Sequence, residues 1–297
     1  MTAGPVVVVG DAMTDVLAGV DRPLVPAGDT PASIAIRPGG SGANTAAWLG
    51  HLGVATVFVG CVGDDVFGRD AARALRESGV TPRLAISGAA ATGTCIVLVD
   101  AAGERTMLPD SGANAALAPE HLPRDAFLTG GHLHLSGYTL LRPATRPAAV
   151  AALAAARAAG MATSIDAVSA APLADAGGDS FRRLASDVGT ALVTLDEAEV
   201  LCGSRDPDAI AAALLPGFGE VVLKLGSQGA EWRGPGGVRA GAAAAPPPGP
   251  VVDTTGAGDA FAAGWIAARR EGHEPAAALE QACAVAATAV TRRGARP

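Results

Sequence analysis

The sequence predicts an α/β protein with a three-layer α/β/α architecture, a doubly wound and mostly parallel sheet, and a small β-strand lid. Short apolar, β-branched runs alternate with helical segments along most of the chain, which is typical of a parallel sheet covered by helices on both faces. Two irregular stretches, approximately residues 13–38 and 92–108, interrupt this alternation. We expect them to form the lid over the carboxyl edge of the sheet, where ligands bind in open α/β folds.

The individual elements follow from local sequence patterns. The Val-rich run at residues 5–10 is continuous, as expected for a strand buried on both faces. In the lid, residues 32–37 alternate as a strand does, and residues 92–100 with 104–108 form a hairpin. The remaining predicted strands are residues 55–60, 132–136, 163–166, 191–195 and 220–225. The predicted helices are residues 42–52, 69–78, 143–159, 181–185, 196–201, 208–215, 258–271 and 275–292.

Composition narrows the class of protein further. Of the 297 residues 49% are hydrophobic and 17% charged, so a large core is expected, and without a long linker we expect one domain over residues 1–297. The net charge of −7, without basic runs, argues against nucleic acid or a membrane surface as partner. The four cysteines are widely spaced and no stretch resembles a membrane helix, which favours a cytoplasmic location.

The strongest chemical signal is the string DTTGAGDAF at residues 253–261. The small residues Gly256, Ala257 and Gly258 open a helix, so their N–H groups and the helix dipole converge on one spot that suits an anion such as a phosphoryl group. Asp259 follows in the first helical turn, where a carboxylate beside a bound phosphate suits the acceptance of a proton from an attacking hydroxyl. The alternative is an ordinary loop in which Asp259 only stabilises the helix dipole.

This string resembles the C-terminal signature of the ribokinase-like carbohydrate kinases, the PfkB family. The motif GGSGANTAAWLG at residues 39–50 resembles the substrate-side signature of the same family. Gly39 and Gly40 let the backbone approach a polyol closely, and Asn44 offers a donor and an acceptor to its hydroxyls. The resemblance covers the whole chain in order.

The resemblance implies an ATP-dependent kinase that phosphorylates a hydroxymethyl group of a small sugar, sugar acid or related polyol. Asp259 is then the general base, and the amides of residues 256–258 form the anion hole. The acceptor lies between sheet and lid, where the family position of Asp15 grips hydroxyls and that of Asp11 assists. Both acids could instead cap turns. Two alternatives remain. One is a nucleoside kinase of the same fold, which the low aromatic content of 3% disfavours, and the other is a catalytically silent ligand sensor.

The nucleotide side is implied by two further similarities. In LDEAE, residues 195–199, we align Asp196 and Glu199 with the Asn-x-x-Glu motif that organises Mg²⁺ and phosphate through water, although Asp196 could merely cap a helix. Residues 221–229 resemble the nucleotide-side strand and turn, and Lys224, Gly226 and Gly229 are expected to bind ATP together with Asp196. Lys224 is the one lysine in the sequence. We expect its ammonium to face the ATP phosphates, and a surface lysine is the alternative.

A monovalent cation and a second subunit are left open. Residues 289–294, together with part of the 253–261 string, resemble the K⁺ loop found beside the anion hole in many members of the family. Such an ion would not touch the substrate but would strengthen the anion hole electrostatically. Exposed lid strands also favour pairing across a homodimer. The residues implied for K⁺ are Asp253, Thr255, Ala289, Arg292 and Gly294.

Overall fold

The computed structural model describes residues 4–101 and 104–297, and within these residues nine strands form the main sheet in the order β13-β12-β11-β10-β9-β8-β1-β4-β5. The strands from β11 to β5 are parallel, whereas β12 and β13 continue the sheet antiparallel. The bounds are β1 Val6–Val9, β4 Thr56–Gly63, β5 Val80–Ser87, β8 His132–Ser136, β9 Ala162–Asp166, β10 Val188–Thr194, β11 Phe218–Lys224, β12 Ala230–Arg233 and β13 Arg239–Ala242.

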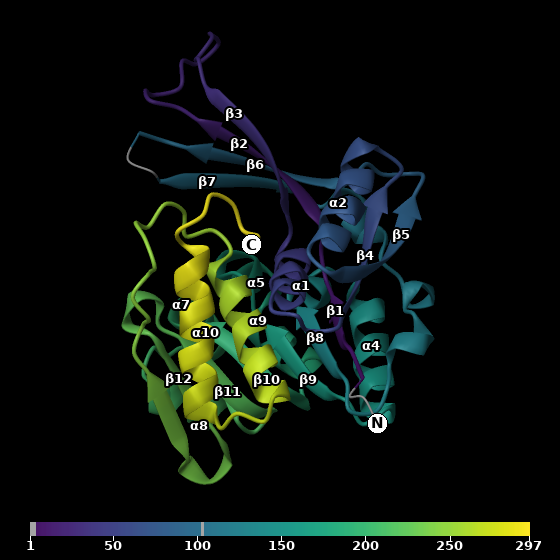
Figure 1. Ribbon diagram of the computed structural model, residues 1–297, viewed down its shortest axis with the longest axis vertical. Coiled ribbons are helices and arrows are strands. Elements are labelled where there is room, and N and C mark those ends of the chain that lie inside the picture. The colour runs from purple at the N-terminus through teal and green to yellow at the C-terminus, as the bar shows by residue number, and fades with distance from the viewer. Residues whose placement is uncertain (1–3, 102–103) are drawn as a thin grey trace.

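Helices cover both faces of this sheet, which confirms the predicted three-layer α/β/α fold (Figure 1). In β1 the side chains of Val6 and Val8 pack in one buried cluster and those of Val7 and Val9 in the other, which is why the strand is apolar throughout. The first cluster includes α1 Ser41–His51, α2 Val66–Glu77, α9 Ala257–Arg270 and α10 Pro275–Ala289. The second includes α3 Tyr138–Leu141, α4 Arg146–Ala158, α5 Ala170–Ala176, α6 Gly178–Leu184, α7 Leu195–Cys202 and α8 Pro207–Leu214.

The lid is a separate sheet in the order β3-β2-β6-β7, and Figure 1 shows it projecting above the main body with the C-terminus beneath it. Its pairing is mixed, because β2 and β6 run parallel while the two outer pairs are antiparallel. The predicted lid strands are therefore present. They are β2 Met13–Gly19, β3 Ser33–Gly39, β6 Gly93–Val99 and β7 Arg105–Asp110.

The lid joins the main sheet at a buried polar clamp. Asn114 lies in the short 3₁₀ helix η1, Gly112–Ala116, and its side-chain carbonyl accepts a hydrogen bond from Ala12 N at 2.9 Å. Its amide donates to Ala12 O at 2.9 Å and to Ser111 O at 3.0 Å. The clamp satisfies both backbone groups of Ala12 where the chain leaves β1 for the lid, so it helps to fix how the lid departs. Within the described residues no helix is both long and apolar enough to cross a bilayer.

Candidate active site

The turn before α9 has the geometry that an anion-binding helix start requires. Gly256 is the N-cap with φ of 76°, and a Cβ there would lie 2.6 Å from Ala295, so a side chain is excluded by conformation and by space. The first N–H groups of a helix have no acceptor inside the helix. Of the three predicted anion-hole amides, that of Ala257 donates to Thr254 O at a long 3.3 Å. The turn can therefore present amides to a ligand, with Ala257 the most engaged of the three.

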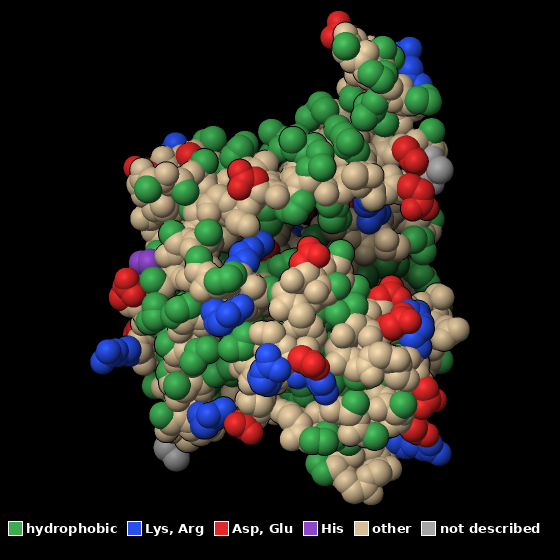
Figure 2. Space-filling view, turned by 180° about the vertical axis from the view of Figure 1, so that it is seen from behind, with side chains coloured by type: hydrophobic (Ala, Val, Ile, Leu, Met, Phe, Trp, Pro, Cys, Tyr) green, Lys and Arg blue, Asp and Glu red, His purple; other side chains and the backbone are tan. Residues whose placement is uncertain are grey.

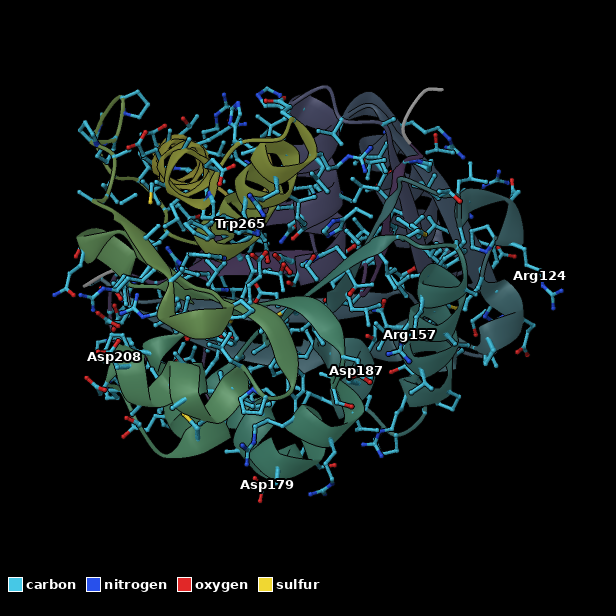
Figure 3. The ribbon with its side chains drawn as sticks, turned by 90° about the horizontal axis from the view of Figure 1, so that it is seen from below. Arg124, Arg157, Asp179, Asp187, Asp208 and Trp265 are labelled. Atoms are coloured by element: carbon cyan, nitrogen blue, oxygen red, sulfur yellow. The ribbon has the colours of Figure 1, made fainter. Side chains whose placement is uncertain are left out.

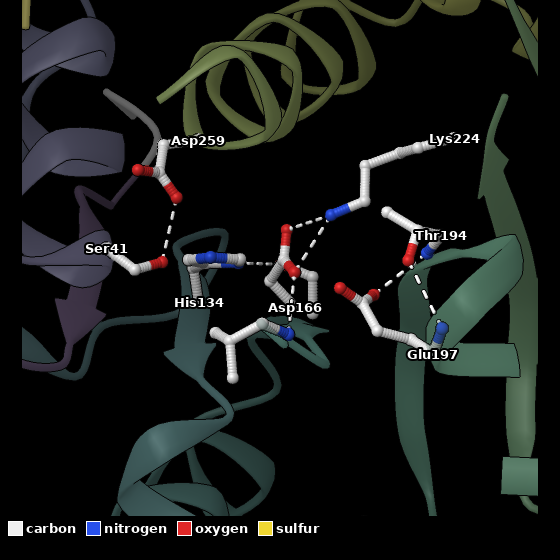
Figure 4. Close-up of polar contacts among 9 residues, drawn as sticks. Ser41, His134, Asp166, Thr194, Glu197, Lys224 and Asp259 are labelled. Carbon is white, nitrogen blue, oxygen red and sulfur yellow. Dashed lines mark hydrogen bonds and ion pairs between the residues drawn. The ribbon is translucent and has the colours of Figure 1, made fainter. Parts of the chain in front are cut away.

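Asp259 connects the two predicted signature motifs. Ser41 Oγ donates to its Oδ1 at 2.8 Å (Figure 4), and Asn44 Nδ2 donates to its Oδ2 at 2.9 Å. Burial raises the pKa of Asp259 to about 7; the hydrogen bond from Asn44 opposes this shift and the charge of Asp166 adds to it. A carboxylate with a pKa near neutrality is suited to accept a proton at physiological pH.

The Gly-Gly turn at the start of α1 lies against both Asp11 and Asp15, which have different roles. A Cβ on Gly39 would lie 2.4 Å from the Asp15 carboxylate, and one on Gly40 would lie 2.5 Å from the Asp11 carbonyl oxygen. The Asp11 carboxylate accepts hydrogen bonds from the amides of Ser41 at 3.1 Å and Gly42 at 3.4 Å, and from the Ser136 hydroxyl at 3.1 Å. Asp11 thus holds the N-terminus of α1, the capping role that the sequence left as an alternative.

Asp15 is the acid that remains for a ligand at this turn. It lies on β2 of the lid, and burial raises its pKa to about 6, while the positive charge of Arg296 opposes that rise. A carboxylate under a lid strand, beside two glycines, can accept hydrogen bonds from the hydroxyls of a small ligand.

Arg296 is a site residue that the sequence motifs did not identify. Its Nε donates to Asn44 Oδ1 at 3.1 Å and its Nη2 donates to Gly39 O at 2.8 Å. The preceding residue, Ala295, is fixed in place, because it is buried and its carbonyl oxygen accepts a hydrogen bond from Trp48 Nε1 at 3.0 Å. The guanidinium therefore lies among the predicted substrate residues. An arginine outside any motif carries no signal in the sequence that could have revealed this placement.

A cavity of about 660 Å³ lies on the other side of the α9 turn. Three of the four residues predicted to bind ATP, Lys224, Gly226 and Gly229, line it, and the fourth, Asp196, does not. Gly258 lines it at the helix start, and Phe261 and Val290 contribute to an apolar wall. The cavity therefore combines a polar end beside the anion-binding turn with an apolar end that suits a flat ring system.

Three neighbouring strands direct charged or polar side chains to the polar end of this cavity. Asp166 ends β9, Thr194 ends β10 and Lys224 ends β11, and Thr194 and Lys224 are paired in register. Lys224 Nζ donates to both Asp166 oxygens, at 2.9 and 2.7 Å (Figure 4). Burial lowers the pKa of Lys224, but the charges of Asp166 and Glu197 outweigh it and hold that pKa above its usual value. Lys224 is thus a buried cation at the site, not a surface lysine.

The structure does not bring Asp196 and Glu199 to this cavity. Both accept from Arg205 Nη1, at 2.6 and 2.9 Å, and their side chains are 71% and 56% exposed. Glu197, only 4% exposed, instead lies near Lys224 and Asp166, and burial raises its pKa. Glu197 is therefore the acid of α7 that lies near the Lys224–Asp166 pair, whereas Asp196 and Glu199 lie at the surface.

A local signal in the sequence accounts for the inward position of Glu197. Thr194 and Glu197 form a capping box: Glu197 N donates to Thr194 Oγ1 at 3.3 Å and Thr194 N donates to Glu197 Oε2 at 2.8 Å. Such a Thr-x-x-Glu pattern marks the first turn of a helix. It would have placed Thr194 at the strand end and Glu197 facing inward.

The residues implied for K⁺ come together, but an arginine from the lid lies against them. Arg105 Nη2 pairs with Asp253 Oδ1 at 2.7 Å, and Arg105 Nη1 donates to Thr255 Oγ1 at 2.6 Å. Gly294 N donates to Asp253 Oδ2 at 2.9 Å. Arg292 is exposed, with its guanidinium 5.9 Å from the Trp48 ring centre, and Ala289 ends α10. In the described part of the chain no three His, Cys, Asp or Glu side chains are grouped to hold a metal ion.

Comparison with known proteins agrees with this geometry. The model of the pfkB family carbohydrate kinases matches residues 4–297. The chain is 36% identical to an ATP-dependent ribose-1-phosphate kinase of Halopiger xanaduensis, over 97% of this chain and 92% of that protein. It is 33% identical to a fructokinase of Klebsiella pneumoniae, over 89% and 84%. A putative ribokinase II from E. coli in complex with ATP and Mg²⁺ superposes with a TM-score of 0.86 at 27% identity, over 98% and 94%.

The Lys224–Asp166 pair predicts strongly coupled effects on stability. Lys224→Met and Asp166→Asn should each lower the free energy of unfolding by about 3–5 kcal/mol, because each change removes one partner of a buried ion pair. The double variant should lose clearly less than the sum. Urea unfolding of the four proteins measures this. Arg157→Gln is the control, since its exposed partner Asp187 lies 3.7 Å away at the surface (Figure 3), and it should change little. Additive losses would contradict the pairing.

Proposed function

Because this chain belongs to the PfkB family of carbohydrate kinases, we propose that it transfers the γ-phosphoryl group of ATP to a hydroxymethyl group of a small sugar, sugar acid or related polyol. The observation that carries the proposal is the placement of Asp259. Its carboxylate lies at the start of α9, held by α1 on the predicted acceptor side and next to the turn that borders the cavity. Phosphoryl transfer requires a group that takes up a proton and lies between the site of the sugar hydroxyl and the site of the phosphate.

In the proposed reaction Asp259 accepts the proton of the acceptor hydroxyl. The hydroxyl oxygen forms a bond to the γ-phosphorus, the bond between that phosphorus and the bridging oxygen breaks, and ADP leaves with the electron pair. The N–H groups at residues 256–258 and the dipole of α9 stabilise the negative charge on the phosphoryl oxygens during transfer. The lid above the acceptor would exclude water and so limit hydrolysis of ATP.

The acceptor site that we propose lies under β2 and β3. Asp15 accepts hydrogen bonds from acceptor hydroxyls, while Gly39 leaves room for the Asp15 carboxylate and Gly40 for the backbone of Asp11, so that both border the site. Asn44 and Arg296 complete the site, with Asn44 also positioning Asp259 through its hydrogen bond of 2.9 Å. Asp11 acts indirectly, because it fixes the start of α1 from which Ser41 and Asn44 project.

The nucleotide site that we propose is the cavity lined by Lys224, Gly226 and Gly229. The residues fit a Mg²⁺–nucleotide, because Mg²⁺ is usually held by one or two carboxylates, water and substrate phosphates, and the buried carboxylates of Asp166 and Glu197 lie beside Lys224, which lines the cavity. Bound there, Mg²⁺ would neutralise charge on the phosphates. Lys224 would hold Asp166 in place and add a positive charge beside Gly258, where a Cβ would lie 3.6 Å from its Nζ.

We also propose that two copies of the chain associate through the lid. Ile36, Ile96 and Leu108 lie in one register row across the lid sheet, and all three are exposed. In Figure 2 hydrophobic side chains gather over the lid region. An exposed apolar sheet face of this kind favours pairing with a second copy.

Replacing the proposed base tests the reaction. Asp259→Asn should lower kcat with ATP and the preferred acceptor by about 10²–10⁴-fold, because the amide cannot accept the proton. A coupled assay of ADP formation over a panel of sugars and sugar acids measures it. Asp187→Asn, a surface change far from α9 (Figure 3), is the matched control and should keep wild-type turnover. Near-normal turnover of Asp259→Asn on that acceptor would rule out its role as base.

We propose that Glu197, and not Glu199, serves the Mg²⁺–phosphate site, which predicts opposite behaviour of these two glutamates in one helix. Glu197→Gln should raise the Mg²⁺ concentration needed for half-maximal activity and lower kcat, because it removes a carboxylate from the phosphate site. Glu199→Gln should leave both values unchanged, since that side chain faces Arg205 at the surface. Mg²⁺ titrations of initial rate at fixed ATP decide between them. A larger effect of Glu199→Gln would restore the original alignment.

A further inference from the structure

We propose that Arg105, a residue of the lid, provides the fixed positive charge beside the anion-binding turn in place of a bound monovalent cation, and that it thereby couples lid closure to phosphoryl transfer. The inference rests on the proposed function for its catalytic meaning. It makes Arg105 a positioning residue, because its guanidinium acts through Asp253 and Thr255 and not on the substrate.

Arg105 contacts Asp253 and Thr255 directly. Arg105 lies at the start of β7, and its two terminal nitrogens reach Asp253 Oδ1 at 2.7 Å and Thr255 Oγ1 at 2.6 Å. Asp253 is only 7% exposed, so this ion pair is well shielded from solvent on the carboxylate side. Charge-assisted bonds from a guanidinium with two anchoring points fix direction as well as distance.

Both oxygens of the Asp253 carboxylate, which a cation at this turn would need, already accept hydrogen bonds. Asp253 Oδ1 also accepts a hydrogen bond from Thr255 N at 2.8 Å, and Asp253 Oδ2 accepts one from Gly294 N at 2.9 Å. A K⁺ ion bound to the same oxygens would have to displace the guanidinium or lie next to it, and two like charges at that separation repel each other. The residues implied for K⁺ therefore do not fit the ion while Arg105 is in place.

Other nearby cations do not take this role. Arg292 is exposed and lies over the Trp48 ring. Arg296 donates to Asn44 and Gly39 on the acceptor side. Lys224 is paired with Asp166 across the nucleotide cavity. Among the residues that the structure describes, Arg105 is the cation placed on the Asp253 carboxylate.

The contact joins the lid to the turn before α9. Asp253 and Thr255 lie immediately before the Gly256 N-cap, so their positions set the direction of the first amides of α9. Arg105 comes from the lid sheet, about 150 residues earlier in the chain. A lid that moved away from the body would remove the charge from the turn. The anion-binding amides would then be fully ordered only when the lid covers the acceptor, which would limit phosphoryl transfer to water.

Replacing K⁺ in the buffer by choline at matched ionic strength tests the inference. Wild-type kcat should be the same in both salts. Arg105→Ala in choline should lose on the order of tenfold in kcat with little change in the KM of the acceptor, less than the 10²–10³-fold that loss of a direct oxyanion donor costs. Added K⁺ or guanidinium ion should restore part of the rate, and Arg105→Lys should retain most of it. Arg22→Ala, an exposed arginine of the lid region, is the control and should behave as wild type.

A thermal-shift measurement separates failure of this inference from failure of the proposed function. K⁺, relative to choline, should raise the Tm of Arg105→Ala and not that of the wild type, whether or not an acceptor has been found. The inference would be overturned if K⁺ alone raised the wild-type activity several-fold or the wild-type Tm by several degrees. An unchanged kcat of Arg105→Ala in choline would overturn it as well. A wild type inactive on every acceptor would contradict the proposed function, while the Tm comparison would still decide the role of Arg105.

Discussion

The site depends on one constraint: α1, near the start of the chain, and α9, near its end, must begin at the same point. Two hydrogen bonds enforce this, from Ser41 and Asn44 of α1 to the two oxygens of Asp259 in α9. Each helix start is prepared independently, α1 by the carboxylate of Asp11 and α9 by the left-handed Gly256. The shared carboxylate is thereby desolvated, and this burial raises its pKa toward neutrality, whereas the two hydrogen bonds that hold it oppose the rise.

The fold could be predicted where local pattern determines structure. The apolar run of β1, the strand β8 and the lid strands follow from periodicity and composition, because a buried parallel strand is apolar throughout and a lid strand alternates. Three strands at the edges of the main sheet were not predicted, namely the antiparallel β12 and β13 at one edge and the parallel β5 at the other. Those segments contain Gly, Pro and Arg at positions that weaken a strand pattern, and long-range pairing with β11 and β4 stabilises them.

The site could be predicted only where a motif is contiguous. Residues 39–44 and 256–259 are such cases, since the geometry of a helix start is encoded within a few positions. The sequence could not show that Glu197 is buried and Glu199 exposed, because nearby acids in one helix look alike in sequence and only helical rotation separates the inward side chain from the exposed one. Arg105 and Arg296 meet their partners through tertiary structure, so no local pattern indicates them.

The charges of the site are balanced, because the acidic groups Asp15, Asp166 and Asp259 lie near the buried cations Arg296 and Lys224.

In the proposed reaction Asp259 must be ionised to act. The most direct measurement is the pH dependence of wild-type kcat/KM for the acceptor. The account predicts a fall of about tenfold for each pH unit below an apparent pKa of about 7. A profile that stays flat down to the ordinary aspartate value of 3.8 would contradict it.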